Sequence, residues 1–165
     1  MEIIITNKKS DIDFDKLMEV YYESNMENIE KSSYFSVESI DAFREKEIFD
    51  NYKKDYINYL KEDFLANKEN YIAIIRNKDT YLSALRLHYE EDSYLIEALE
   101  TNPDFRNRGY GEKLLKSVLI KFPKKTVFNS EVGLNNKKSL GLHKKLGFKI
   151  LERRKSNLLL AYNIE

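Results

Sequence analysis

Apolar residues follow two kinds of spacing along the chain. A short apolar run over residues 3–6 predicts a first strand. Spacings of three and four residues across 11–32 and 38–66 predict two helices. Apolar segments separated by short polar turns then predict three neighbouring strands, over 71–76, 81–89 and 94–101.

The rest of the chain alternates helices with strands. A helix over 110–121 carries an apolar stripe, and the elements predicted after it are a strand over 126–132, a helix over 136–146, and strands over 148–153 and 157–163. No repeat or linker interrupts this order. The 165 residues therefore predict a single domain, 1–165, of mixed α/β (α+β) class, in which roughly 70% of the unfolded surface is buried.

The segment between the strand over 94–101 and the helix over 110–121 carries the most informative polar pattern. Arg106 and Arg108 precede Gly109 and Gly111, and the helix starts immediately afterwards. Unpaired N–H groups and the dipole of a helix N-terminus favour an anion, and glycine lets the backbone approach it closely. The spacing fits neither a Walker loop nor a dinucleotide fingerprint, since Leu114 stands where the latter needs glycine. The pattern predicts an anion cradle of another kind.

Two motifs in the right order resemble one family. Arg106-x-x-Gly109-x-Gly111 resembles the coenzyme A pyrophosphate loop of the GNAT superfamily of N-acetyltransferases. The segment 136–148 resembles the same family's pantetheine-binding helix. Matching positions are Asn136, Ser139, Leu142, Lys145, Gly147 and Phe148. The resemblance extends from about Tyr71 to the C-terminus, and it implies a GNAT-like central mixed, largely antiparallel sheet with helices on both faces.

The resemblance also implies an activity. Acetyl-CoA would donate an acetyl group to a primary amine of a small molecule, by direct attack without a covalent enzyme intermediate and without a metal. The alternative is a non-catalytic GNAT-fold module that binds acyl-CoA or a protein partner. The family motifs imply that the backbone of Leu99 and Thr101 binds the cofactor. The other implied cofactor-binding residues are Arg106, Asn107, Arg108, Gly109, Tyr110, Gly111, Glu112, Asn136, Ser139 and Lys145. Among the side chains of the loop, Arg108 is the favoured contact.

Glu97 is the favoured general base. Strand alternation places Leu95, Glu97, Leu99 and Thr101 on one face and Glu100 on the other, so that Glu97 is flanked by leucines. Partial burial would raise the pKa of its carboxyl toward that of a working base. The alternative is that Glu97 only pairs with a cation on a neighbouring strand.

His143 stands where most of the family has a tyrosine thought to protonate the departing thiolate. Histidine can donate a proton near neutral pH, and some branches of the superfamily carry it at this position. Its spacing from Leu140 and Leu146 places it on the inner helix face, where the alternative is a packing role.

Net charge adds a hint about ligands. The chain is neutral overall, but residues 101–165 carry 15 basic and five acidic side chains, against 13 and 23 in residues 1–100. The basic half suits an anionic cofactor such as coenzyme A. Acidic and aromatic residues in the first half suit a cationic amine. The tyrosines concerned are Tyr21, Tyr22, Tyr34, Tyr52, Tyr56 and Tyr59.

Several classes of function are disfavoured. The chain has no cysteine and two histidines, so a thiolate nucleophile is excluded and a metal site is not expected. No apolar window approaches a membrane span, and the short apolar start is unlike a signal peptide, which predicts a cytoplasmic protein. Scattered basic pairs without a recognition motif predict no nucleic-acid partner. A homodimer remains open.

Overall fold

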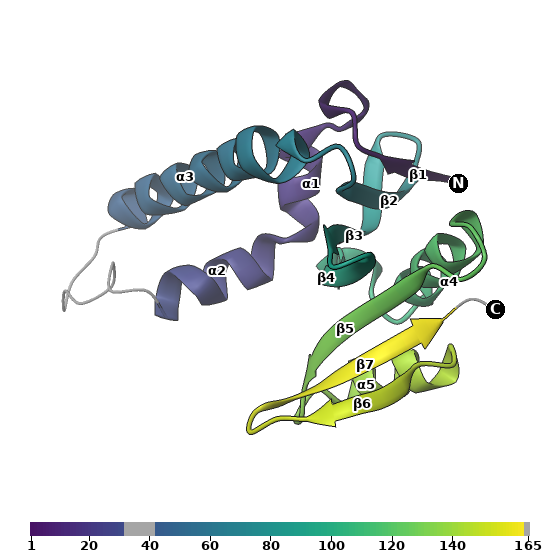
Figure 1. Cartoon of the computed structure of the whole chain (residues 1–165). Helices are drawn as coiled ribbons and strands as arrows, with labels where there is room; N and C mark the ends of the chain where they lie inside the picture. The colour runs from purple at the N-terminus through teal and green to yellow at the C-terminus, as the bar shows by residue number, and fades with distance from the viewer. Residues whose placement is uncertain (32–41, 164–165) are drawn as a thin grey trace.

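The computed structural model describes residues 1–31 and 42–163 and contains a seven-stranded sheet. The strands are β1 (Glu2–Thr6), β2 (Tyr71–Asn77), β3 (Thr80–Glu90), β4 (Ser93–Thr101), β5 (Val127–Gly133), β6 (Lys149–Arg153) and β7 (Asn157–Asn163). Their order across the sheet is β1-β2-β3-β4-β5-β7-β6 (Figure 1). Only β4 and β5 pair in parallel, so the predicted mixed and largely antiparallel sheet is confirmed.

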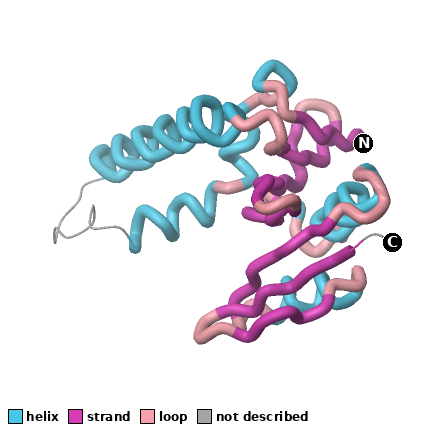
Figure 2. The backbone as a smooth tube through the Cα atoms, in the orientation of Figure 1, coloured by secondary structure: helices cyan, strands magenta, loops and turns pink. Residues whose placement is uncertain are grey.

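Helices cover both faces of the sheet, as predicted (Figures 1 and 2). They are α1 (Phe14–Val20), α2 (Tyr22–Lys31), α3 (Ala42–Asn58), α4 (Tyr110–Lys121) and α5 (Lys137–Lys145). The predicted helix over 110–121 coincides with α4. The predicted helix over 11–32 is interrupted at Tyr21, and α3 ends in a π-helical turn, Tyr59–Asp63. Residues 32 and 38–41 of the predicted helices and Tyr34 lie outside the described residues.

Two apolar layers hold the helices to the sheet. On one face, Leu114, Leu115 and Val118 of α4 pack on residues of the central strands such as Leu85 and Phe128. The other face packs against α1 and the end of the α3 segment, with these residues fully or nearly buried: Leu17, Met18, Leu60, Phe64, Leu65, Ile72 and Ile74. Because β2 and β3 are covered on both faces, they have nearly continuous apolar sequences.

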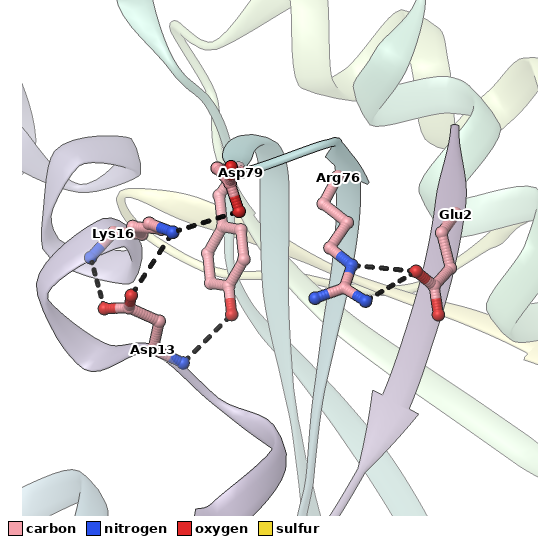
Figure 3. A network of polar contacts seen from close by, with 6 residues as sticks. Glu2, Asp13, Lys16, Arg76 and Asp79 are labelled. Atoms are coloured by element: carbon pink, nitrogen blue, oxygen red, sulfur yellow. Dashed lines mark hydrogen bonds and ion pairs between the residues drawn. The ribbon is translucent and has the colours of Figure 1, made fainter.

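Polar contacts fix the edge of the sheet next to α1 (Figure 3). Arg76 of β2 donates to Glu2 of β1 at 2.8 Å, which joins the edge strand to its neighbour. Asp13 caps α1 by accepting from the Lys16 N–H at 3.2 Å, and its own N–H donates to the Tyr81 hydroxyl at 2.9 Å. Such caps and exposed pairs contribute about 1 kcal/mol or less each, so they define geometry more than stability.

A bulge in β4 decides which side chains face the site. Arg86 of β3 lies opposite Glu97, and Ala84 lies opposite Glu100, so β4 has one residue more than β3 between these pairs. The extra residue is accommodated at Ala98, whose φ is 48°. An inserted residue reverses the alternation of faces beyond it.

The predicted grouping of Leu95, Glu97, Leu99 and Thr101 on one face is therefore wrong. Glu97 reaches Arg86 beneath the N-terminal helices, whereas Leu99 packs with the apolar layer of α4. Glu100 lies on the same side as Glu97 and is influenced by Ser24 and other residues of α2. The bulge thus brings a second carboxylate to the face that strand parity assigned to Glu97 alone.

Within the described residues, no helix combines the length and apolar character of a membrane span.

Candidate functional site

A groove of about 460 Å³ lies where β4, the following loop, α4 and α5 meet. It combines residues that are 43 positions apart in the sequence, because β4 leads into α4 while α5 follows β5. The lining residues are Leu99, Glu100, Thr101, Arg106, Asn107, Gly111, Asn136, Lys138, Ser139 and Leu142. Seven of the cofactor-binding residues expected from the sequence are among them, and so is one carboxylate that was assigned to the opposite face.

The wall formed by β4 has an open backbone edge. The parallel pairing of β4 with β5 runs from Ser93 with Val127 to Ile96 with Ser130 and ends there. Beyond Ile96, β4 is paired only with β3 in the ladder. Leu99 and Thr101 line the groove, and within the described residues neither is paired with a residue of β5. Backbone groups that lie outside a ladder can form hydrogen bonds with a ligand. That a thioester oxygen and pantetheine amides bind at this edge stays a prediction.

The N-terminus of α4 lies at the groove, where Gly111 is a lining residue. Gly109 is the residue before the helix, with a φ of 77° and no side-chain cap. The first N–H groups of α4 are therefore not consumed by a capping side chain. A Cβ at Gly111 would meet the Thr101 hydroxyl oxygen at 3.3 Å, so glycine permits the close approach of α4 to β4. The helix start and its two glycines thus lie where the sequence predicted them, and their role as an anion cradle stays a prediction.

The two arginines of the loop have different surroundings. Arg106 lines the groove, and its Nε donates to the Thr101 carbonyl at 3.4 Å. Its Nη1 forms a 2.6 Å ion pair with Glu23 of α2. The Arg108 guanidinium lies over the Phe105 ring, 5.4 Å from its centre, outside the groove lining. The structure thus favours Arg106 over Arg108 as the side chain that meets an anion.

Helix α5 supplies the opposite wall. Asn136 caps it by accepting a hydrogen bond from the Ser139 N–H at 3.1 Å, and both residues line the groove. Lys145 lies at the far end of α5, where its Nζ pairs with Glu112 of α4 at 2.7 Å. The other expected residues are not among those that line the groove: Arg108, Gly109, Tyr110, Glu112 and Lys145.

Glu97 makes the cross-strand pair that was its alternative assignment. Its Oε2 lies 3.4 Å from Arg86 Nη2, and its Oε1 lies 3.9 Å from His88 Nδ1. The Arg86 side chain is 14% exposed, and its guanidinium lies within 6 Å of three aromatic rings of the N-terminal half. The Glu97 carboxylate is therefore engaged by a cation of the neighbouring strand.

Glu100 has the opposite environment. It lines the groove beside Leu99 and Thr101. Burial raises the pKa of its carboxyl above the ordinary value, against the lowering influence of Ser24 and Arg106. A carboxylate with a raised pKa at a groove wall has the properties of a general base.

His143 is buried, as expected for the inner face of α5, and it lies outside the groove lining. Its Nδ1 lies 2.8 Å from the Ser139 carbonyl oxygen. Because a carbonyl can only accept, Nδ1 carries the proton of the neutral ring, and Nε2 has only a lone pair. Nε2 is buried without a hydrogen-bond partner among the described residues, and the ring packs edge-on against Phe148, with the two ring centres 4.8 Å apart. This geometry favours packing over proton donation, and the acid role stays a prediction.

The environment of His143 predicts an acid-sensitive fold. Burial lowers the pKa of His143 below its ordinary value of 6.5. The unfolded chain therefore binds the proton more readily, and the stability from neutral His143 is full above pH 6.5 and is lost as the pH falls below it. His143→Gln should reduce the fall in melting temperature between pH 7.5 and 5.5. The matched control is His88→Gln, and a larger reduction for that variant would contradict the assignment.

Three groove residues were not among those selected from the sequence motifs: Glu100, Lys138 and Leu142. Leu142 matches the family motif, so the signal for it was present. Lys138 lies in the same segment, next to Ser139, without a motif position of its own. For Glu100, strand alternation predicted the face opposite to that of Glu97. No local signal in the sequence marks the bulge that reverses this alternation, because the extra residue is set by how β3 pairs with β4.

The fold and the groove agree with the outcome of the family comparison. The model of the acetyltransferase (GNAT) family matches residues 24–148, and the chain belongs to this family. No curated protein sequence is detectably similar to it.

Solved structures share the fold over nearly the whole chain. The PaiA N-acetyltransferase of Thermoplasma acidophilum, solved with coenzyme A, has a TM-score of 0.66 and 18% identity, and the match covers 99% of each chain. An acetyltransferase from Thermus thermophilus has a TM-score of 0.68 and 14% identity, with 99% of this chain and 98% of that chain covered. YncA of Salmonella typhimurium, solved with acetyl-CoA, has a TM-score of 0.61 and 13% identity, over 100% and 95% of the two chains.

Proposed function

We propose that this GNAT protein transfers an acetyl group from acetyl-CoA to a primary amine of a small molecule. The observation that carries the proposal is the groove, in which an open strand edge, an unblocked helix N-terminus and a carboxylate with a raised pKa meet. The first two features suit the amides and phosphates of coenzyme A, and two structural neighbours were solved with that cofactor or its acetyl form. The third suits deprotonation of an amine.

The donor would bind along the groove. The pyrophosphate would meet the N–H groups of the loop and first turn of α4, from Arg106 to Glu112, with the Arg106 side chain in addition. The pantetheine arm would run between the open edge of β4 and the Asn136 end of α5. Backbone N–H groups near Leu99 would stabilise the charge that develops on the thioester oxygen.

The acceptor would approach from the side of the N-terminal helices. Of the two carboxylates on that face, we assign the base to Glu100 rather than Glu97, because Glu100 lines the groove and Glu97 is held by Arg86. Glu100 would remove the proton as the amine attacks the acetyl carbon, and the carbon–sulfur bond then breaks to release the thiolate. The thiolate takes up a proton to become free coenzyme A.

A thermal melt with and without acetyl-CoA tests the proposal. A ligand at about 100 times its dissociation constant adds about 2.7 kcal/mol, which for a domain of this size raises the melting temperature by roughly 5–10 °C. Gly109→Asp should abolish the shift, because it places a carboxylate at the phosphate cradle and a Cβ at a φ of 77°.

Gly133→Asp is the matched control, since a Cβ there meets nothing within 4 Å and the residue lies at the end of β5. That variant should keep the full shift. A panel of amines with thiol release as readout then tests transfer itself. A shift without thiol release from any amine would favour the non-catalytic acyl-CoA-binding module. No shift at saturating acetyl-CoA would refute both acetyl transfer and acyl-CoA binding, and would leave the module that binds a protein partner.

A further inference from the structure

The cofactor groove is tied to α2 by one arginine. Arg106 Nη1 lies 2.6 Å from Glu23 Oε2, although Glu23 belongs to α2 and Arg106 to the loop between β4 and α4. The same guanidinium is oriented by its Nε bond to the Thr101 carbonyl. The side chain that faces the groove is therefore already neutralised by a carboxylate from the acceptor side of the protein.

This ion pair is weak enough to be exchanged. The side chains of Arg106 and Glu23 are 43% and 48% exposed. An exposed ion pair of this kind changes an equilibrium constant by up to about fivefold, which corresponds to about 1 kcal/mol. A diphosphate offers more charge and more acceptor oxygens than one carboxylate, and arginine binds phosphate through several N–H groups at once.

The exchange would change the charge on the acceptor side. Glu23 and Glu27 of α2 both raise the pKa of Glu100, while Arg106 lowers it, so these four side chains share one electrostatic neighbourhood. Glu27 has its own partner, Lys31, at 3.4 Å. If a phosphate engages Arg106, Glu23 loses its partner and the mouth of the groove gains an uncompensated negative charge next to Glu100.

We propose that Glu23 is a gate residue: it occupies Arg106 in the free protein, competes with the cofactor pyrophosphate for it, and is released when the cofactor binds. This inference rests on the proposed function, since it assumes that coenzyme A occupies the groove. Cofactor binding then releases α2 from the loop that follows β4 and leaves Glu23 free to meet a cationic acceptor. By linkage, whatever engages Glu23 also favours cofactor binding.

Titration calorimetry with coenzyme A tests the competition. Glu23→Gln should bind coenzyme A about three- to fivefold more tightly than the parent, because Arg106 no longer has to leave a carboxylate. Glu27→Gln is the matched control: it removes the same charge one helical turn away, without contact to Arg106, and should change the affinity by less than twofold. In an Arg106→Gln background, Glu23→Gln should have no further effect on the affinity for coenzyme A.

Hydrogen exchange supplies an independent readout. Binding of coenzyme A should slow exchange in α4 and α5 but speed it in α2, because α2 loses its contact with Arg106. Glu23→Gln should remove the effect on α2 and keep the protection of α4.

The outcomes separate two failures. If the parent protein does not bind coenzyme A, the gate and the proposed function both fail. If it binds, but Glu23→Gln leaves the affinity unchanged or acts no more strongly than Glu27→Gln, the gate alone is refuted.

Discussion

Glu100→Gln should lower kcat by about 10²–10⁴-fold while the affinity for coenzyme A changes little. This is the usual contribution of a general base, and glutamine keeps the shape of the side chain but cannot accept the proton. Glu100 lies at the groove beside the strand edge that would hold the thioester, and burial raises the pKa of its carboxyl. Steady-state kinetics with an amine found by thiol release provides the measurement.

The pH profile makes this expectation specific to Glu100. The base must be deprotonated, so kcat falls as the pH drops below its pKa, and a raised pKa moves this acid limb above that of an ordinary carboxyl. The limb should disappear in Glu100→Gln. Glu97→Gln is the comparison variant. It should lower kcat tenfold or less, because Arg86 already pairs with that carboxylate. If Glu97→Gln proves the more damaging variant, the base is Glu97, as strand alternation suggested.

Arg86→Leu should destabilise the fold by about 3–5 kcal/mol, the cost of removing one partner from a largely buried ion pair. Arg86 is 14% exposed at its side chain and Glu97 is 27% exposed. Leucine would leave the Glu97 carboxylate beneath the N-terminal helices without its cation. It would also remove the guanidinium from the rings of Tyr56, Tyr59 and Phe64. Urea unfolding of both proteins measures the difference.

The double variant Arg86→Leu/Glu97→Leu distinguishes an ion-pair effect from lost packing. Replacing both charges with apolar residues removes the unpaired carboxylate, so most of the stability should return. If the double variant is as unstable as Arg86→Leu, the packing of the guanidinium against the aromatic rings, rather than its charge, is what stabilises this region.

Local signals account for the parts of the fold that the sequence predicted well. The boundaries of α4 were predictable because its apolar stripe starts directly after Gly109 and ends at Phe122. The short turns between β2, β3 and β4 were recognisable from runs of polar residues. The split of the first helix at Tyr21 was not, because Leu17, Val20 and Tyr21 continue a helical spacing across the break. All three are buried, so the apolar pattern continues through the point at which the helical backbone is interrupted.

The same division applies to the candidate site. Motifs of neighbouring residues were enough to predict the family, which the comparison confirmed, and to place the helix start with its two glycines, because glycine spacing and a helix start are local properties. The tertiary structure alone decided that Glu97 faces Arg86, that Glu100 shares its face, and that Glu23 holds Arg106. These facts depend on one extra residue at Ala98 and on the docking of α2. A period-two pattern cannot reveal a bulge, since the extra residue is fixed by how β3 pairs with β4, and an ion pair across 83 positions of sequence exists only once the chain has folded.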